Sequence, residues 1–154
     1  MITNKYLRKV VSAYNSWIYA SRRRISLTIS AQELPSPKPR LLHRVGYNKI
    51  RAMSKGISDS ITISGITNTN SMEPLIDEGH LALIEDPPRK EDLIVEDIIL
   101  FFRVIDRQRV LHRIIEVGVD ENGWYCITRG DNTVWIDGKI RYNNVLGVCV
   151  GIIY

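Results

Sequence analysis

Short apolar runs follow one another from residue 61 onward, and each is about as long as a β-strand. They cover residues 61–66, 80–85, 97–105, 109–117, 123–128 and 145–153. Turn-forming pieces such as Asp86-Pro87-Pro88 and Asp137-Gly138 separate them. Because no long helical pattern interrupts the series, it predicts a mainly β fold, with a body of antiparallel strands over residues 61–154.

The first 60 residues have a different pattern. Apolar residues recur at helical spacing over 4–20, residues 25–31 alternate like a short strand, and 41–56 could form a second short helix ending near Gly56. Between them, LPSPKPR at 34–40 holds three prolines in five residues, which predicts an extended linker. The sequence therefore predicts an N-terminal arm (1–60) and a separate β domain (61–154).

Charge divides at the same place. Residues 1–60 carry twelve lysines and arginines against two acids, a net charge of +10, and residues 61–154 carry nine against fifteen, a net charge of −6. A basic arm could bind an anionic membrane surface, nucleic acid or an acidic, membrane-bound partner. The pattern over 4–20 favours an ordinary packing helix, with a basic amphipathic helix that lies on lipid or nucleic acid as the alternative.

The chain has no apolar stretch of about 18 residues and no apolar secretory core near its N-terminus. We therefore expect a protein that is cytoplasmic or peripheral to a membrane. Cys126 and Cys149 lie in strand-like runs without CxxC spacing, which favours buried thiols, with a single disulfide as the alternative. No cluster of ligand-type residues implies a metal or a cofactor.

Three segments of the β domain carry residues suited to nucleophilic catalysis. Such chemistry needs a hydroxyl, a base within reach and a group that orients the base. Ser71, His112 and an aspartate, either Asp131 or Asp137, supply one of each type. Each signal is weak alone, because a loop serine, a strand histidine and a Gly-Asp-Asn turn are all common in proteins without this chemistry.

Their order and surroundings together are more specific. Ser71-Met72-Glu73-Pro74, Leu111-His112-Arg113-Ile114, Gly130-Asp131-Asn132 and Asp137 follow one another in this order. This set resembles the signal peptidase I superfamily, in its endoplasmic-reticulum and archaeal type, which has a histidine base. The resemblance covers about residues 61–154. Since the sequence shows no apolar anchor segment, it is more similar to the soluble members of this superfamily. The resemblance implies a serine endopeptidase that cleaves a peptide or a precursor protein.

The resemblance also implies roles for individual residues. Ser71 would be the nucleophile and His112 the base, with Asp137 the first choice to orient His112 and Asp131 the second. Thr69 and the Ser71 backbone N–H would hold the oxyanion. Met72 and Pro74 would shape the loop and the substrate pocket. His80 stands where relatives have another residue and is expected at the surface, and His43 in the arm is assigned no role.

Two other functions stay open at this point. Repressors that cleave themselves share the β fold of the signal peptidase I superfamily and join it to an N-terminal DNA-binding domain. A basic segment ahead of the β domain is similar to that arrangement. However, they cut at Ala-Gly or Cys-Gly, neither of which occurs here, and they use a lysine base. A non-catalytic scaffold that kept the fold is the other alternative.

Overall fold

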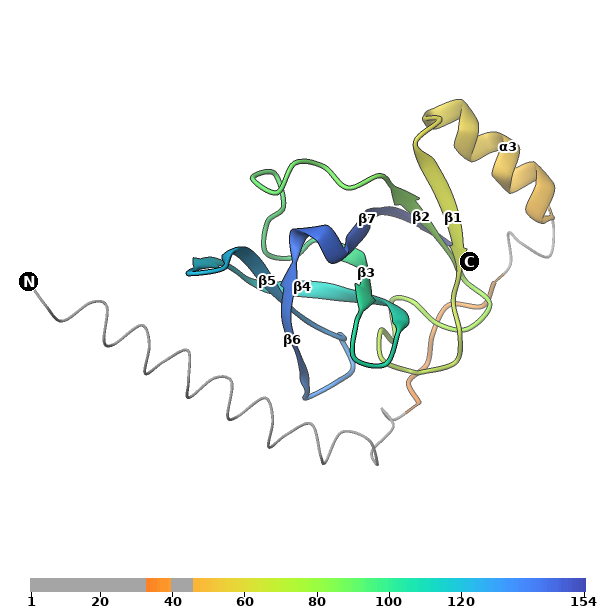
Figure 1. Cartoon of the computed structure of the whole chain (residues 1–154). Helices are drawn as coiled ribbons and strands as arrows, with labels where there is room; N and C mark the ends of the chain where they lie inside the picture. The colour runs from red at the N-terminus through yellow and green to blue at the C-terminus, as the bar shows by residue number, and fades with distance from the viewer. Residues whose placement is uncertain (1–32, 40–45) are drawn as a thin grey trace, which may run out of the picture.

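The computed structural model describes residues 33–39 and 46–154. The helix expected over 4–20, the strand over 25–31, the start of the helix over 41–56 and His43 all lie outside these residues. Figure 1 shows the described part as one curled sheet with a helix at its side and long loops at one end.

A single sheet contains every strand of the described part, and the prediction of a mainly β fold is confirmed. Its strand order is β1-β2-β7-β3-β4-β5-β6, with all neighbours antiparallel. The strands are β1 (Ile61–Gly65), β2 (Leu81–Glu85), β3 (Ile98–Arg103), β4 (Gln108–Asp120), β5 (Gly123–Arg129), β6 (Ile136–Arg141) and β7 (Val145–Ile153); η1 (Tyr142–Asn144) is a short 3-10 turn.

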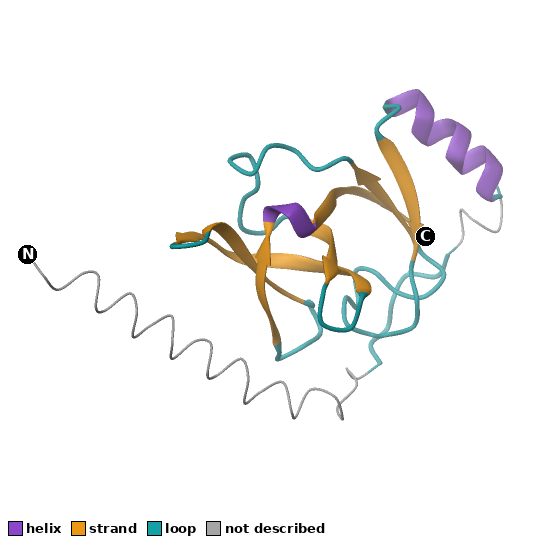
Figure 2. Ribbon diagram, viewed as in Figure 1, coloured by secondary structure: helices purple, strands orange, loops and turns teal. Residues whose placement is uncertain are grey.

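Register shifts bend this sheet into its curled form. They occur between β2 and β7, β3 and β7, β4 and β5, and β5 and β6. An extra residue in one strand increases the local twist and bends the ladder. The sheet is therefore curled, as the curved arrows in Figure 2 show. Its core contains Leu93, Ile99, Phe101, Ile114, Cys126, Ile140 and Val145.

Two local predictions were wrong. Asp137-Gly138 is part of β6 and not a turn, because β5 offers an edge with which this polar segment pairs. The apolar run 97–105 does not continue as a strand, since β3 ends at Arg103 and the chain reverses through Val104 and Ile105. The tight connection from β3 to β4 therefore leaves these two apolar side chains exposed to solvent, although their hydrophobicity favours burial.

Helix α3 (Tyr47–Ile57) is the described part of the helix expected over 41–56. It begins only after Gly46, whose φ of 82° is a left-handed conformation that glycine adopts readily. Ile50 is buried on one face, and the helix lies along β1. The end of the segment 1–60 thus packs on the β body, while the division at residue 60 remains a sequence prediction.

Both cysteines are free thiols. Cys126 is buried in the core as expected, and burial raises its pKa to about 12, so the thiol stays protonated at neutral pH. Cys149 is only half-buried. The alternative of a single disulfide between them is therefore not found.

His80 is buried, and the expectation of a surface residue was wrong. Its Nδ1 accepts a hydrogen bond from the Asp77 N–H at 3.1 Å, and its Nε2 lies 2.5 Å from the Pro37 carbonyl oxygen. The sequence could not show this burial, because the covering residues come from 43 positions earlier in the chain.

Candidate active site

Ser71 lies in the loop between β1 and β2, residues 66–80, which we call the β1–β2 loop. Just before it, Asn70 has a φ of 56°, a left-handed conformation that asparagine tolerates better than most residues. The Asn132 backbone N–H donates to the Ser71 carbonyl at 3.0 Å, and its side-chain amide donates to the Asn70 carbonyl at 2.9 Å. On the other side, Met72 is buried against Ile76. These contacts hold Ser71 from both directions.

Ser71, His112 and Asp137 form one hydrogen-bonded chain. The Ser71 Oγ lies 3.1 Å from His112 Nε2, and His112 Nδ1 lies 2.6 Å from Asp137 Oδ2. A carboxylate can only accept, so Nδ1 carries the imidazole proton and Nε2 is left to accept from the serine hydroxyl. This is the arrangement in which a histidine can take a proton from a serine.

Sheet register brings the histidine and the aspartate together. His112 lies on β4 and pairs with Ile99 of β3. Between the pairs Ile127↔Lys139 and Arg129↔Ile136, β5 has one residue, Thr128, and β6 has two, Asp137 and Gly138. Such a bulge redirects side chains next to it. Here the Asp137 carboxylate reaches both His112 and Thr128.

Asp137 is nearly buried and remains ionised because several donors surround it. Burial by itself would raise its pKa, but the His112 hydrogen bond and charge, the Thr128 hydroxyl at 2.7 Å and the Arg103 guanidinium at 3.3 Å outweigh this and lower it. Arg103 is in turn held by Asp106, with contacts between 2.6 and 3.0 Å. The carboxylate therefore stays charged opposite His112 at neutral pH.

Asp131, the second candidate for orienting His112, has another partner. Its carboxylate forms a two-pronged ion pair with Arg113, at 2.8 and 2.7 Å. Arg113 also donates to the Glu96 carbonyl at 2.9 Å. Asp131 thus ties the turn after β5 to strand β4, and Asp137 is the aspartate that contacts the imidazole.

Gly130 packs directly under this site. A β-carbon there would lie 2.4 Å from the Ser71 carbonyl oxygen and 3.0 Å from His112 Nε2. The first distance is too short for a carbon and the second is tight, so any side chain would displace the Ser71 main chain. Glycine is required at this position by close approach, and its backbone can then pack against the Ser71 main chain.

A cleft of about 580 Å³ opens over Ser71. Its walls include Ile66, Thr69, Met72, Leu111 and Trp135. The Thr69 hydroxyl lies 3.2 Å from Ser71 Oγ, beside the atom that would attack a substrate. Pro74, by contrast, is exposed and does not line the cleft. The structure therefore places Thr69 and Met72 at the site, and Pro74 outside it.

Sequence reasoning assigned no role to three residues that support the site: Arg103, Thr128 and Gly130. Gly130 is the first residue of the Gly-Asp-Asn turn and Thr128 lies two residues before it, so that motif was an available signal for both. Arg103 has no such signal, because a basic residue at the end of a strand is usually solvated. Only the folded hairpin of β3 and β4 brings its guanidinium to Asp137.

The comparisons with known proteins add no relative. A scan against protein-family models and a search of curated proteins each gave no match to this chain. The residue pattern and the geometry of Ser71, His112 and Asp137 are therefore the basis for a functional proposal.

Proposed function

We propose that this chain is a signal-peptidase-like serine endopeptidase that acts on a peptide or precursor protein. The observation that carries the proposal is the chain of contacts from Ser71 Oγ through His112 to Asp137. Three residues far apart in sequence meet in the order that nucleophilic catalysis needs. They do so at a cleft large enough for several side chains of a bound peptide.

The proposed reaction has two halves. Ser71 Oγ attacks the carbonyl carbon of the substrate, and its proton passes to His112 Nε2. The C–N bond then breaks as His112 returns that proton to the leaving amine, which leaves an acyl group on Ser71. Water, deprotonated by His112, hydrolyses this ester and frees the serine.

Asp137 and Thr69 have supporting roles in this scheme. The ionised Asp137 stabilises the imidazolium that forms when His112 accepts the proton. The oxyanion would be stabilised by the Ser71 backbone N–H together with the Thr69 hydroxyl, 3.2 Å from Ser71 Oγ. The resemblance to signal peptidases further suggests small residues before the cleaved bond.

We place the site of action in the cytoplasm or at the periphery of a membrane. None of the described helices is long and apolar enough to cross a bilayer. The charge of +10 over residues 1–60 supports contact with an anionic surface or partner, which would bring the cleft to substrates that arrive there.

Cleavage of peptides with small residues before the expected bond tests the proposal. Wild type, Ser71→Ala and His112→Ala are compared by mass spectrometry, which follows both products and an acyl adduct on Ser71. We expect either substitution to lower kcat at least about 1,000-fold, because the members of such a chain act as a unit. Ser36→Ala is the matched control, since its hydroxyl contacts only the Leu34 carbonyl in the described residues.

Two results would count against the proposal. Cleavage that survives in Ser71→Ala would exclude this serine as the nucleophile. If wild type cleaves nothing from pH 6 to 9, with or without anionic lipid, the scaffold or regulator alternatives would take precedence.

A further inference from the structure

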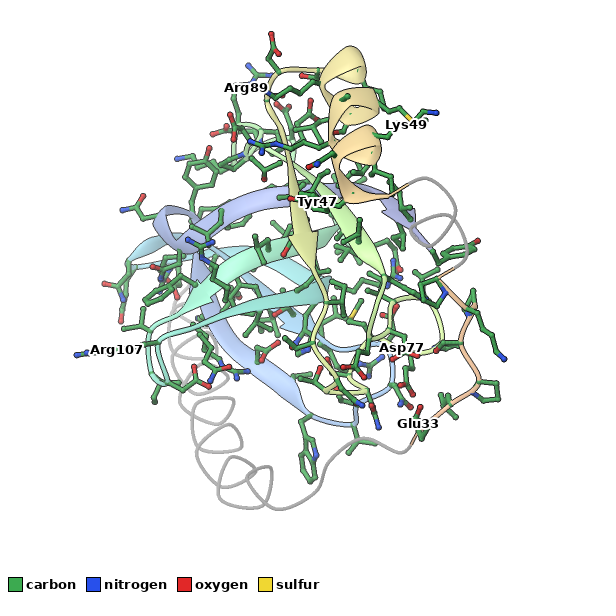
Figure 3. The ribbon with its side chains drawn as sticks, turned by 90° about the vertical axis from the view of Figure 1, so that its right-hand side faces the viewer. Glu33, Tyr47, Lys49, Asp77, Arg89 and Arg107 are labelled. Atoms are coloured by element: carbon green, nitrogen blue, oxygen red, sulfur yellow. The ribbon has the colours of Figure 1, made fainter. Side chains whose placement is uncertain are left out.

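Residues 33–39 lie against the β1–β2 loop, the loop that carries Ser71. The Leu34 backbone N–H donates to Glu73 Oε2 at 2.6 Å, and the Pro37 carbonyl oxygen contacts the His80 ring. Gly79 packs so closely that a β-carbon there would lie 3.2 Å from the Pro39 ring. Figure 3 shows Asp77 on the loop and Glu33 at the start of the segment beside it.

Glu73 is an unusual residue in this contact. It is 1% exposed, and although Oε2 accepts the Leu34 N–H, Oε1 has no hydrogen-bond partner within the described residues. Burial raises its pKa, and the nearby Glu33 and Asp77 carboxylates raise it further. A buried carboxylate oxygen without a donor is costly, so this atom calls for a positively charged or protonated partner.

Glu73 faces two further acids. One carboxylate oxygen each from Glu33, Glu73 and Asp77 lie within 4.8 Å of one another. No lysine, arginine or histidine forms an ion pair with any of the three in the described part of the chain. The Asp77 Oδ1 accepts from the Glu78 N–H at 2.6 Å, which holds this carboxylate in place.

The spacing suits a metal ion. The largest triangle with sides of 4.8 Å has its centre about 2.8 Å from each corner, so a single ion can approach all three oxygens closely. Calcium–oxygen distances are about 2.3–2.6 Å, and calcium accepts irregular geometry completed by water. Magnesium needs shorter, near-octahedral ligation, zinc and copper favour nitrogen or sulfur ligands, and manganese, which also accepts oxygen ligands, is compared in the test below.

We propose that Glu33, Glu73 and Asp77 form a binding site for a divalent cation, with calcium as the preferred ion. Nearby His80 is not a ligand, because both its ring nitrogens are engaged by Asp77 N–H and Pro37 carbonyl groups. The ion would join residue 33 to the loop of Ser71, and so fasten the start of the proline-rich segment. This proposal concerns binding and stands whether or not the chain is a peptidase.

Isothermal titration calorimetry of the full-length protein with CaCl₂ tests the site, with MgCl₂ and MnCl₂ run in parallel. We expect one calcium per chain, bound at least about ten times more tightly than magnesium. Glu73→Gln keeps an acceptor for Leu34 N–H but removes a charge, and should weaken calcium binding at least about tenfold. Glu121→Gln, an exposed glutamate at the β4–β5 turn, is the matched control and should bind like wild type.

Hydrogen exchange of the Leu34 amide provides a second measurement. Calcium should slow this exchange in wild type and leave it unchanged in Glu73→Gln, while circular dichroism checks that the variant is folded. If a proton filled the site instead, calorimetry would detect no calcium binding, and carbon-13 NMR would show a Glu73 carboxyl pKa that is raised and unchanged by calcium. That result, or equal calcium binding by wild type and Glu73→Gln, would overturn the proposal.

Discussion

At the scale of single residues, the two aspartates near His112 have separate tasks. Asp137 contacts His112 Nδ1 at 2.6 Å and is surrounded by donors, whereas Asp131 is paired with Arg113. Both belong to the same stretch of sequence, and both are carboxylates at a turn or a strand start. Only their partners distinguish an orienting group from a structural ion pair.

This difference predicts unequal effects of two matched substitutions. Asp137→Asn should lower kcat about 1,000-fold or more, because an amide can donate to Nδ1 and so favour the wrong tautomer. Asp131→Asn should lower kcat less than about tenfold and reduce stability slightly, since a partly exposed ion pair contributes at most about 1 kcal/mol. Steady-state kinetics of both variants, with urea denaturation, measures this; equal losses of kcat would contradict the assignment.

Gly130 carries a second prediction at this scale. Gly130→Ala places a methyl group 2.4 Å from the Ser71 carbonyl oxygen, so the Ser71 main chain must shift away from its present position beside His112. We expect kcat to fall at least about 100-fold, since displacements of about 1 Å in a site have effects of that order.

Gly56→Ala is the matched control for Gly130→Ala. A β-carbon at Gly56 meets nothing within 4 Å, and the residue lies in α3, away from the cleft. This variant should keep full activity and gain a little helix stability. An active Gly130→Ala protein would show that the site tolerates a side chain under Ser71.

At the scale of elements, one carboxylate joins β4 to β6. Asp120 at the end of β4 accepts from Lys139 and Arg141 of β6, at 2.6 to 3.0 Å, across the intervening β5. Lys139 also lies 4.0 Å from the centre of the Tyr125 ring. This cluster fastens β6, the strand that carries Asp137, although β6 is a sheet edge with a single neighbour.

We expect Asp120→Asn to destabilise the fold by about 1 kcal/mol at pH 7. The hydrogen bonds from Arg141 and Lys139 lower the Asp120 pKa well below its ordinary value, so its stabilisation is complete above about pH 5. It begins to be lost as pH falls below about 4, because the unfolded chain then binds the proton first, and the loss continues down to the lowered pKa of the folded state. Urea denaturation at pH 7 and pH 3 should show a smaller difference in stability between the two proteins at pH 3.

At the scale of the whole molecule, charge separates two regions. Residues 1–60 carry +10 and residues 61–154 carry −6. Each basic residue near an anionic surface contributes about 1 kcal/mol of attraction, and salt screens it. The proposed cation site lies where these regions meet, between Glu33 and the β1–β2 loop.

We expect the full-length chain to bind an anionic surface and to release it in about 0.5 M NaCl. Replacing Arg22, Arg23 and Arg24 by glutamate lowers the net charge by six and should weaken binding at least about tenfold. Sedimentation with phosphatidylserine vesicles and a mobility shift with duplex DNA identify the preferred surface. Binding that is unaffected by salt or by these substitutions would exclude an electrostatic role.

The sequence by itself determined the strand pattern, the division of charge and the residues able to do chemistry. Alternating and continuous apolar runs predicted the strands correctly because burial in a sheet requires them. The sequence could not determine β6, because Asp137-Gly138 is polar and turn-like, and only pairing with β5 makes this segment a strand. The sequence also could not show that Val104 and Ile105 are exposed, because their hydrophobicity alone predicts that they continue the strand.

The tertiary structure alone decided which side chains meet. The contacts of Asp137 with Arg103, of His80 with Pro37 and of Glu73 with Leu34 join positions 34, 43 and 39 residues apart. A sequence lists residue types, but sheet register and loop packing set the distances between them. Those distances distinguish Asp137 from Asp131, and they reveal the three carboxylates beside the Ser71 loop that no local pattern indicated.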